Sequence, residues 1–235
     1  MTEKTTTKEK GAAATGAARA CWDCAAALGL DHFCSVCGKI QPALPGADYF
    51  SFFGLPRKLQ VDAAALERQF HQLSWKLHPD NFHRASTYEQ ELSLEKTATL
   101  NDAYRTLRDP VARVEYLLGL EGVRREGDIK QQAPPDLLAE VFELNEYLEE
   151  LRAAKRSGGD AREMEELRHR LEQARESFQE KMDGVMAELS AQFSRWDGLS
   201  DTAGRKAALE AMSEILNRHS YIRNLVRNVT DELEE

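Results

Sequence analysis

Residues 63–80 read AAALERQFHQLSWKLHPD, a helical pattern that runs directly into a proline. Its apolar side chains recur at spacings of four, three and four residues, at Leu66, Phe70, Leu73 and Leu77. That recurrence gives one apolar face and predicts a helix over residues 63–77. Pro79 cannot continue the helix and moves the residue before it out of helical backbone. We therefore expect His78 and Asp80 to be exposed on a loop at the end of this helix.

The segments on either side complete a helical hairpin. Residues 48–56 read DYFSFFGLP, which predicts a short aromatic helix closed by glycine and proline. Asp62 fits the N-cap of the helix that follows. A further helix is expected from about Ser86 to Arg108, with inward-facing side chains at Leu100, Ala103, Tyr104 and Leu107. The sequence therefore predicts two antiparallel helices joined by the exposed loop.

From residue 134 onward the pattern is helical, and short turns between three helices predict an antiparallel bundle. We expect Pro134-Pro135-Asp136 to cap the first helix. The second is expected over about residues 161–194, ended by Trp196-Asp197-Gly198, and the third over about residues 201–233. The expected core face of the first helix consists of Leu137, Val141, Leu144, Leu148 and Leu151. The apolar positions of the third helix are Leu216, Tyr221, Leu225 and Val229.

Two apolar residues of the first bundle helix, Leu138 and Phe142, lie off its core face beside Asn145, Glu146 and Glu149. Apolar side chains bordered by carboxylates suggest a partner-binding face. A wide core stripe in a three-helix bundle is the alternative. The residues alone leave both interpretations open.

All four cysteines fall in one short segment, as Cys21-x-x-Cys24 and Cys34-x-x-Cys37. Two such pairs supply the four thiolates of a closed tetrahedral metal site. Two disulfides are the alternative, which the expected reducing compartment disfavours. Zinc is the expected metal, and iron fits the same ligands. Because protein ligands fill all four positions, the metal would be structural.

The chain has 235 residues, of which 42% are hydrophobic, and a net charge of -9. This composition indicates a soluble protein of one or two domains, and no apolar run approaches the ~20 residues of a membrane span. Residues 1–16 lack the apolar segment of a secretory signal, so we expect a disordered tail over residues 1–20 of a cytoplasmic protein. The acidic balance argues against a nucleic-acid binder.

These motifs together resemble the HscB family, the J-type co-chaperones of iron–sulfur cluster assembly. The resemblance rests on Asp48-Tyr49-Phe50, Phe53-Gly54-Leu55-Pro56, His78-Pro79-Asp80, Leu100-Asn101-Asp102-Ala103-Tyr104, Leu107, Pro110, Arg113 and Glu115-Tyr116-Leu117-Leu118. The cysteine segment is similar to the tetracysteine extension of eukaryotic members. The implied fold is all-α and L-shaped, with a zinc module at residues 21–41, a J-domain at residues 48–120 and a C-terminal three-helix bundle at residues 134–235.

The resemblance implies a co-chaperone that is not itself an enzyme. It would bind the scaffold IscU, deliver it to an HscA- or DnaK-type chaperone and stimulate that chaperone's ATPase, which promotes cluster transfer to other proteins. The implied chaperone-binding residues are His78, Pro79, Asp80, Arg68 and Lys76. The implied scaffold-binding residues are Leu138, Phe142, Glu143, Glu146, Glu150 and Tyr221, and Cys21, Cys24, Cys34 and Cys37 would hold the zinc. No nucleic acid or membrane partner is expected, and the protein would be a monomer or a weak homodimer.

One position departs from the family pattern. The second helix of a J-domain usually carries a basic stripe, but here Trp75 stands where a basic residue is expected and Glu67 dilutes the stripe. Electrostatic steering of the partner should therefore be weaker than for a basic helix. Trp75 either belongs to the docking face or packs on the C-terminal domain, and both interpretations stay open.

Other functions are also compatible with parts of the sequence. A general J-protein would deliver unfolded clients to a DnaK-type chaperone through the same loop. A zinc-knuckle protein would bind nucleic acid in a salt-dependent way. A redox sensor would lose its metal on reversible oxidation of the cysteines.

Overall fold

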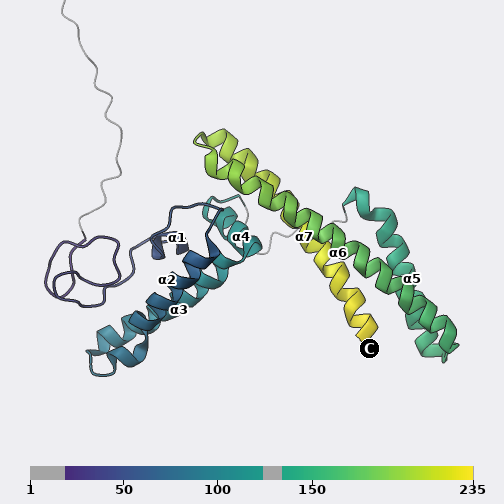
Figure 1. Cartoon of the computed structure of the whole chain (residues 1–235), viewed down its shortest axis with the longest axis horizontal. Coiled ribbons are helices and arrows are strands. Elements are labelled where there is room, and N and C mark those ends of the chain that lie inside the picture. The colour runs from purple at the N-terminus through teal and green to yellow at the C-terminus, as the bar shows by residue number, and fades with distance from the viewer. Residues whose placement is uncertain (1–18, 124–133, 235) are drawn as a thin grey trace, which may run out of the picture.

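The structure, a computed structural model, describes residues 19–123 and 134–234. Its elements are α1 (Tyr49–Phe52), α2 (Ala63–Leu77), the 3-10 turn η1 (Pro79–Phe82), α3 (Thr87–Arg108), α4 (Pro110–Leu120), the 3-10 turn η2 (Pro135–Leu137), α5 (Leu138–Ser157), α6 (Ala161–Gly198) and α7 (Thr202–Glu234). Two isolated β-bridges lie near the cysteines. Figure 1 shows two arms that diverge from α4, a hairpin arm (α1 to α3) and a bundle arm (α5 to α7). The predicted all-α fold is confirmed.

The hairpin arm forms as its local sequence predicts. The Asp62 side chain caps α2 by accepting a hydrogen bond from the Ala65 N–H at 3.0 Å. Ser86 caps α3 and forms a capping box with Glu89. The two helices enclose a core whose buried members are Ile40, Phe50, Phe52, Phe53, Leu66, Leu77, Phe82, Leu92, Leu100, Ala103 and Leu107. The predicted inward positions are confirmed, with Tyr104 at the edge of this core.

Helix α4, which the sequence patterns left unassigned, joins the two arms. Asp109 caps it by accepting a hydrogen bond from the Ala112 N–H at 2.7 Å. Its buried side chains belong to the same apolar core as those of α6 and α7, and so does Leu59 from the loop before α2. One continuous core therefore runs from the base of the hairpin arm into the bundle arm.

A carboxylate fixes this joint between the arms. Asp197, near the end of α6, accepts hydrogen bonds from the backbone N–H groups of Leu59 at 2.7 Å and Gln60 at 2.9 Å. The Gln60 side chain also donates to the Ser194 hydroxyl at 2.7 Å. These bonds hold the loop before α2 against the end of α6.

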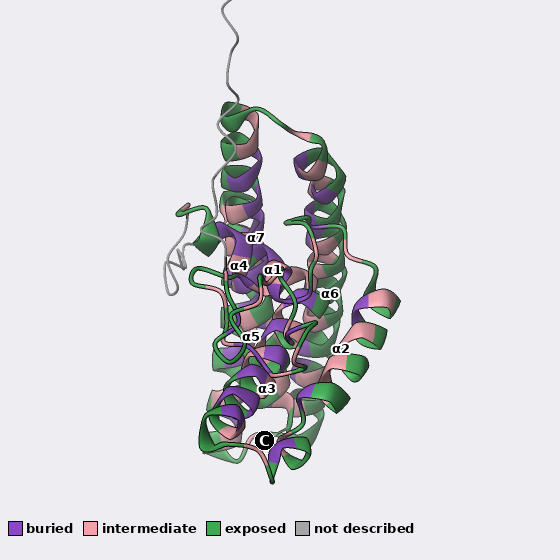
Figure 2. Cartoon of the chain, turned by 90° about the vertical axis from the view of Figure 1, so that its left-hand side faces the viewer, coloured by how far each residue is buried: buried purple, intermediate pink, exposed green. Residues whose placement is uncertain are grey.

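The bundle arm is a long α6–α7 hairpin with α5 packed mainly on α6. In Figure 2 the buried residues of α6 and α7 lie on the sides that face each other, and exposed residues line their outer sides. The predicted core face of α5 is confirmed, because all five of its apolar positions are buried. At the far end, Arg152 and Lys155 of α5 bind the buried carboxylate of Glu232 on α7, at 2.6 and 2.9 Å. Among the described helices, none is long and apolar enough to cross a bilayer.

Three details of the sequence prediction are different in the structure. No side chain caps α5, because Asp136 belongs to the 3-10 turn and Leu137 occupies the N-cap position. Residues 196–198 do not break α6, because Trp196 is only 1% exposed and packs in the core as part of the helix. Residues 1–18 of the predicted tail lie outside the described residues, whereas Ala20 forms a β-bridge with Ala27 in the first cysteine loop.

Asp197→Ala should lower the free energy of unfolding by about 2–4 kcal/mol, because two hydrogen bonds to a charged acceptor are lost. The part-buried bond from Leu59 contributes roughly 1.5–3 kcal/mol, and the exposed bond from Gln60 contributes less. Urea denaturation followed by circular dichroism measures this change. Glu180→Ala, which removes an exposed carboxylate from the same helix, is the control and should change the value by less than about 0.5 kcal/mol. Equal urea midpoints for the two variants would contradict the prediction.

Candidate functional site

The His78-Pro79-Asp80 loop lies at the free tip of the hairpin arm (Figure 1). The side chains of His78 and Asp80 are 54% and 89% exposed, as predicted. His78 Nδ1 accepts a hydrogen bond from the Asp80 N–H at 3.3 Å and lies 3.6 Å from the Asp80 carboxylate. The loop therefore presents an imidazole and a carboxylate to solvent at a set spacing.

Hydrogen bonds beneath the loop hold it in place. The Leu77 carbonyl at the end of α2 accepts hydrogen bonds from the hydroxyls of Ser93 at 2.7 Å and Thr97 at 3.1 Å, both on α3. Phe82, which closes the loop, is buried in the hairpin core. The Asn81 side chain donates to the Trp75 carbonyl at 2.6 Å. The loop is thus fixed on its inner side and open on its outer side.

The outer face of α2 continues this exposed surface. Arg68, Lys76 and Trp75 are all exposed, and Arg68 and Trp75 share one face because they are seven residues apart. The interpretation in which Trp75 packs on the C-terminal domain is wrong. Its side chain is 75% exposed, and the bundle arm meets the hairpin arm at Leu59 and α4, at the other end of α2.

The predicted scaffold-binding residues of α5 share one exposed face. The exposed residues are Leu138, Phe142, Glu143, Glu146 and Glu150, on the side of the helix away from the core. Phe142 is 73% exposed and Leu138 is 42% exposed, which excludes a wide core stripe at these positions. Residues 138–150 contain five glutamates and no lysine or arginine. The face is therefore apolar at its centre and anionic around it.

Tyr221 comes from a different helix than the other predicted scaffold-binding residues. It is on α7, where its side chain is partly buried against the bundle core. Helices α5 and α7 pack against α6 and make few contacts with each other (Figure 1). Tyr221 therefore remains a predicted contact from a second helix.

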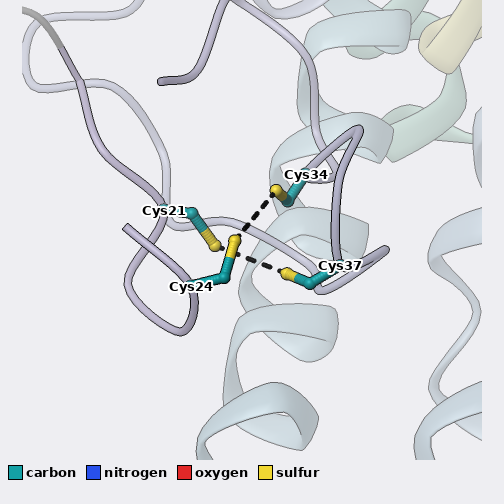
Figure 3. Close-up of side chains that lie close together, drawn as sticks. All are labelled: Cys21, Cys24, Cys34 and Cys37. Carbon is teal, nitrogen blue, oxygen red and sulfur yellow. Dashed lines mark hydrogen bonds between the residues drawn. The ribbon is translucent and has the colours of Figure 1, made fainter. Parts of the chain in front are cut away.

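The four cysteines converge from two loops, with their sulfur atoms all within 4.8 Å of one another (Figure 3). The Sγ atoms of Cys21 and Cys37 are 3.6 Å apart, and those of Cys24 and Cys34 are 3.7 Å apart. Four sulfurs at about 2.3 Å from a tetrahedral ion lie roughly 3.8 Å from one another, so the distances fit a metal site. They exceed the disulfide bond length of about 2.05 Å, and all four residues are free thiols. The disulfide alternative is therefore wrong.

Backbone amides prepare the first cysteine of each loop to bind a metal. The N–H groups of Cys37 and Val36 lower the pKa of Cys34. Burial raises the pKa of Cys21, but hydrogen bonds from the backbone of Cys24 and Asp23 outweigh it and bring the pKa to about 6. Backbone amides at Ala26 and Lys39 lower the pKa of Cys24 and Cys37, but burial and hydrogen bonds with the other cysteines outweigh them, and the pKa of Cys37 rises to about 12. Two of the four sulfurs therefore favour the thiolate, the form that binds a metal.

Residues that the sequence analysis missed attach the cysteine segment to the hairpin arm. Ile40 is fully buried in the hairpin core, two residues after Gly38 of the second loop. Lys39 forms a 2.8 Å ion pair with Glu89, the residue that completes the capping box at the start of α3. The apolar residues Phe33 and Ile40, on either side of the second cysteine pair, are the sequence signal of this attachment.

A contact of the half-buried His32 strengthens the same attachment. Burial lowers the pKa of His32 to about 4, so the ring is neutral near pH 7. Its Nε2 lies 3.0 Å from the Phe52 carbonyl, and its Nδ1 lies 3.1 Å from the Lys96 ammonium nitrogen. Burial also lowers the pKa of Lys96 to about 8. These contacts join the segment between the two cysteine loops to α1 and α3.

Known proteins resemble the chain in both arms. The family model described as the HSCB C-terminal oligomerisation domain matches residues 133–230. The co-chaperone protein HscB homolog of Aromatoleum aromaticum is 34% identical over 188 residues, 80% of this chain and 94% of that protein. The iron-sulfur cluster co-chaperone protein HscB of Mus musculus is 37% identical over 141 residues, 58% of this chain and 60% of that protein.

Solved structures match the fold as well. Chaperone HscB from Vibrio cholerae matches with a TM-score of 0.56 at 29% identity, over 79% of this chain and 96% of that one. Human co-chaperone protein HscB matches with a TM-score of 0.58 at 26% identity, over 90% of this chain and 97% of that one. The likeness therefore extends over most of both arms.

Cys34→Ser should release the metal and lower the melting temperature by about 5 °C or more, because the cysteine segment supplies Ile40 to the hairpin core. Elemental analysis gives the metal content per chain, and near-ultraviolet circular dichroism follows melting. Ser35→Ala, a change at an exposed residue of the same loop, should alter neither quantity. Retention of the metal, or its loss with no change in melting temperature, would contradict the prediction.

Proposed function

Because this chain belongs to the HscB family of co-chaperones, we propose that it binds an IscU-type iron–sulfur scaffold and delivers it to an HscA- or DnaK-type chaperone. It would stimulate the ATPase of that chaperone and so promote transfer of the cluster to acceptor proteins. The family assignment supports the co-chaperone role. The two partners are proposed from the exposed faces of the two arms.

One observation carries the proposal: the chain presents two separate exposed faces on two arms that are joined through Leu59 and α4. The first is the loop at residues 78–80 with the outer face of α2, and the second is the exposed face of α5. A core that continues through α4 holds the two faces apart. This arrangement suits a protein that binds two partners at the same time.

The proposed action of the loop on the chaperone is conformational. His78 offers a hydrogen-bond donor or acceptor and Asp80 offers an acceptor, both on a loop whose inner side is fixed. Contacts that are stronger in one state of the chaperone shift its population toward that state. ATP hydrolysis would then take place in the chaperone. Arg68 and Lys76 would support docking through acidic groups of the partner.

The proposed scaffold site combines apolar and charged contacts. Phe142 and Leu138 would enter an apolar recess of the scaffold, and Glu143, Glu146 and Glu150 would face basic residues around it. Aromatic side chains at the centre of an interface commonly supply most of its binding free energy. Tyr221, which is partly buried on α7, would add a contact from the last helix.

We propose zinc as the metal of the cysteine site. Four thiolates at tetrahedral spacing are the donor set of structural zinc centres, and zinc supplies cross-linking of the two loops without redox chemistry. A site of four reduced cysteines also favours a reducing compartment such as the cytoplasm. The metal would hold the segment that Lys39, Ile40 and His32 attach to the hairpin arm.

The wild-type protein is expected to stimulate the steady-state ATPase of an HscA-type chaperone. His78→Gln should reduce this stimulation by about tenfold or more. The glutamine keeps a polar side chain but loses the imidazole at its set position. His169→Gln, on the exposed surface of α6, is the control and should stimulate like the wild type.

The same assay is repeated with and without an IscU-type scaffold. The proposed function expects the scaffold to increase the stimulation further. Stimulation that is indifferent to the scaffold would favour a general J-protein, and a wild-type protein without any effect on the chaperone would refute the proposal.

Phe142→Ala should weaken binding of the IscU-type scaffold about tenfold or more, because the most exposed apolar side chain of α5 is removed. Isothermal titration calorimetry measures the affinity. Leu94→Ala removes a 59% exposed leucine from α3 on the hairpin arm and should leave the affinity unchanged. Equal affinities for the wild type and the Phe142 variant would show that the scaffold binds elsewhere.

A further inference from the structure

Trp75 is the most exposed large apolar side chain in the described residues, at 75%. It lies outside both apolar cores of the fold. An indole that remains in water leaves roughly 150–250 Å² of surface available for burial against another molecule. Packing within the chain therefore does not account for a tryptophan at this position.

The position of Trp75 is set by the loop beside it. Its carbonyl accepts the 2.6 Å hydrogen bond from Asn81, so its backbone and the His-Pro-Asp loop form one fixed unit. Trp75 lies two helical turns, about 10 Å, from Arg68 along the same face of α2. His71, also exposed, lies one turn from Trp75. The indole is thus continuous with the surface proposed to meet the chaperone.

The charge around Trp75 is opposite to that of the chain as a whole. Residues 57–86 carry five lysines and arginines against three aspartates and glutamates, a net charge of +2, whereas the chain carries -9. The exposed face of α5, in contrast, is anionic. A partner with an acidic surface therefore fits the α2 face better than the α5 face.

We propose that Trp75 is the apolar anchor of the chaperone-docking surface, and that its indole enters an apolar recess of the chaperone's ATPase domain beside acidic groups that meet Arg68 and Lys76. This inference rests on the proposed function. Interfaces concentrate binding free energy in a few central residues, among which tryptophan is the most enriched. The indole takes the place of a charge contact, so this chain would select a chaperone that has an apolar recess there.

The anchor changes how binding responds to salt. Ion pairs at a protein surface weaken as ionic strength rises, because the screening length falls to about 8 Å at 0.15 M. Burial of apolar surface is not screened in this way. Docking through Trp75 should therefore keep most of its affinity at salt concentrations that weaken a purely basic helix.

The test measures the concentration of this protein that gives half-maximal stimulation of an HscA- or DnaK-type chaperone, at 50 and 200 mM potassium chloride. Trp75→Ala should raise that concentration about tenfold or more at both salt concentrations, with the maximal rate retained. Trp75→Arg should recover part of the loss at 50 mM and lose it again at 200 mM. Leu94→Ala, the matched apolar control on α3, should behave as the wild type.

Several outcomes would overturn the inference. If the wild type and Trp75→Ala gave equal half-maximal concentrations, the role of Trp75 as an anchor would be refuted and the proposed function would stand. A fall in the maximal rate alone would place Trp75 in the triggering of hydrolysis instead of in docking. A wild-type protein that stimulates neither type of chaperone refutes the proposed function and the anchor with it. Thermal melting of Trp75→Ala should match the wild type, because the indole packs against neither core.

Discussion

The rest of the structure depends on the joint at which the hairpin arm enters the core of the bundle arm. Leu59 and the buried side chains of α4 complete an apolar core that α6 and α7 begin, and Asp197 holds the backbone of Leu59 and Gln60 against the end of α6. Burial of this apolar surface holds the two arms together. The two hydrogen bonds are directional and so fix the orientation of the loop before α2 relative to α6. Without it the two exposed faces would belong to independent units. With it, their separation is a property of the fold.

Local patterns in the sequence predicted most of the helices because caps and apolar spacing are local. Asp62 acts as the N-cap that the sequence indicates, α3 begins next to Ser86 as expected, and the core face of α5 is buried as its periodicity predicts. The prediction that residues 196–198 end the helix was wrong because of tertiary packing. Burial of Trp196 keeps the helix intact through positions whose local pattern suggests a stop. The role of Asp197 was equally invisible, because its partners lie more than 130 residues earlier in the chain.

For the candidate sites, too, local features were predictable and long-range contacts were not. The cysteine spacing predicted a metal site, and the proline predicted an exposed loop, because both are short-range signals. The attachment of the cysteine segment to the hairpin arm was not predictable, since it joins Lys39 to Glu89 and His32 to Lys96 across the fold. Exposure of Trp75 and Phe142 also needed the structure, because an apolar residue off a core stripe can still be buried by a neighbouring helix. Each arm proves to carry one highly exposed aromatic side chain.

The continuity of α6 through Gly198 has an evolutionary consequence. Helix α5 packs on one half of α6, where Lys181 pairs with Glu140, and the joint lies on the other half at Asp197. Insertion or deletion of one residue between these points would rotate the two halves by about 100° relative to each other. The stretch should therefore tolerate substitutions at its exposed positions more readily than a change in its length. Gaps in alignments of related chains should avoid this stretch and collect instead in the turns between helices.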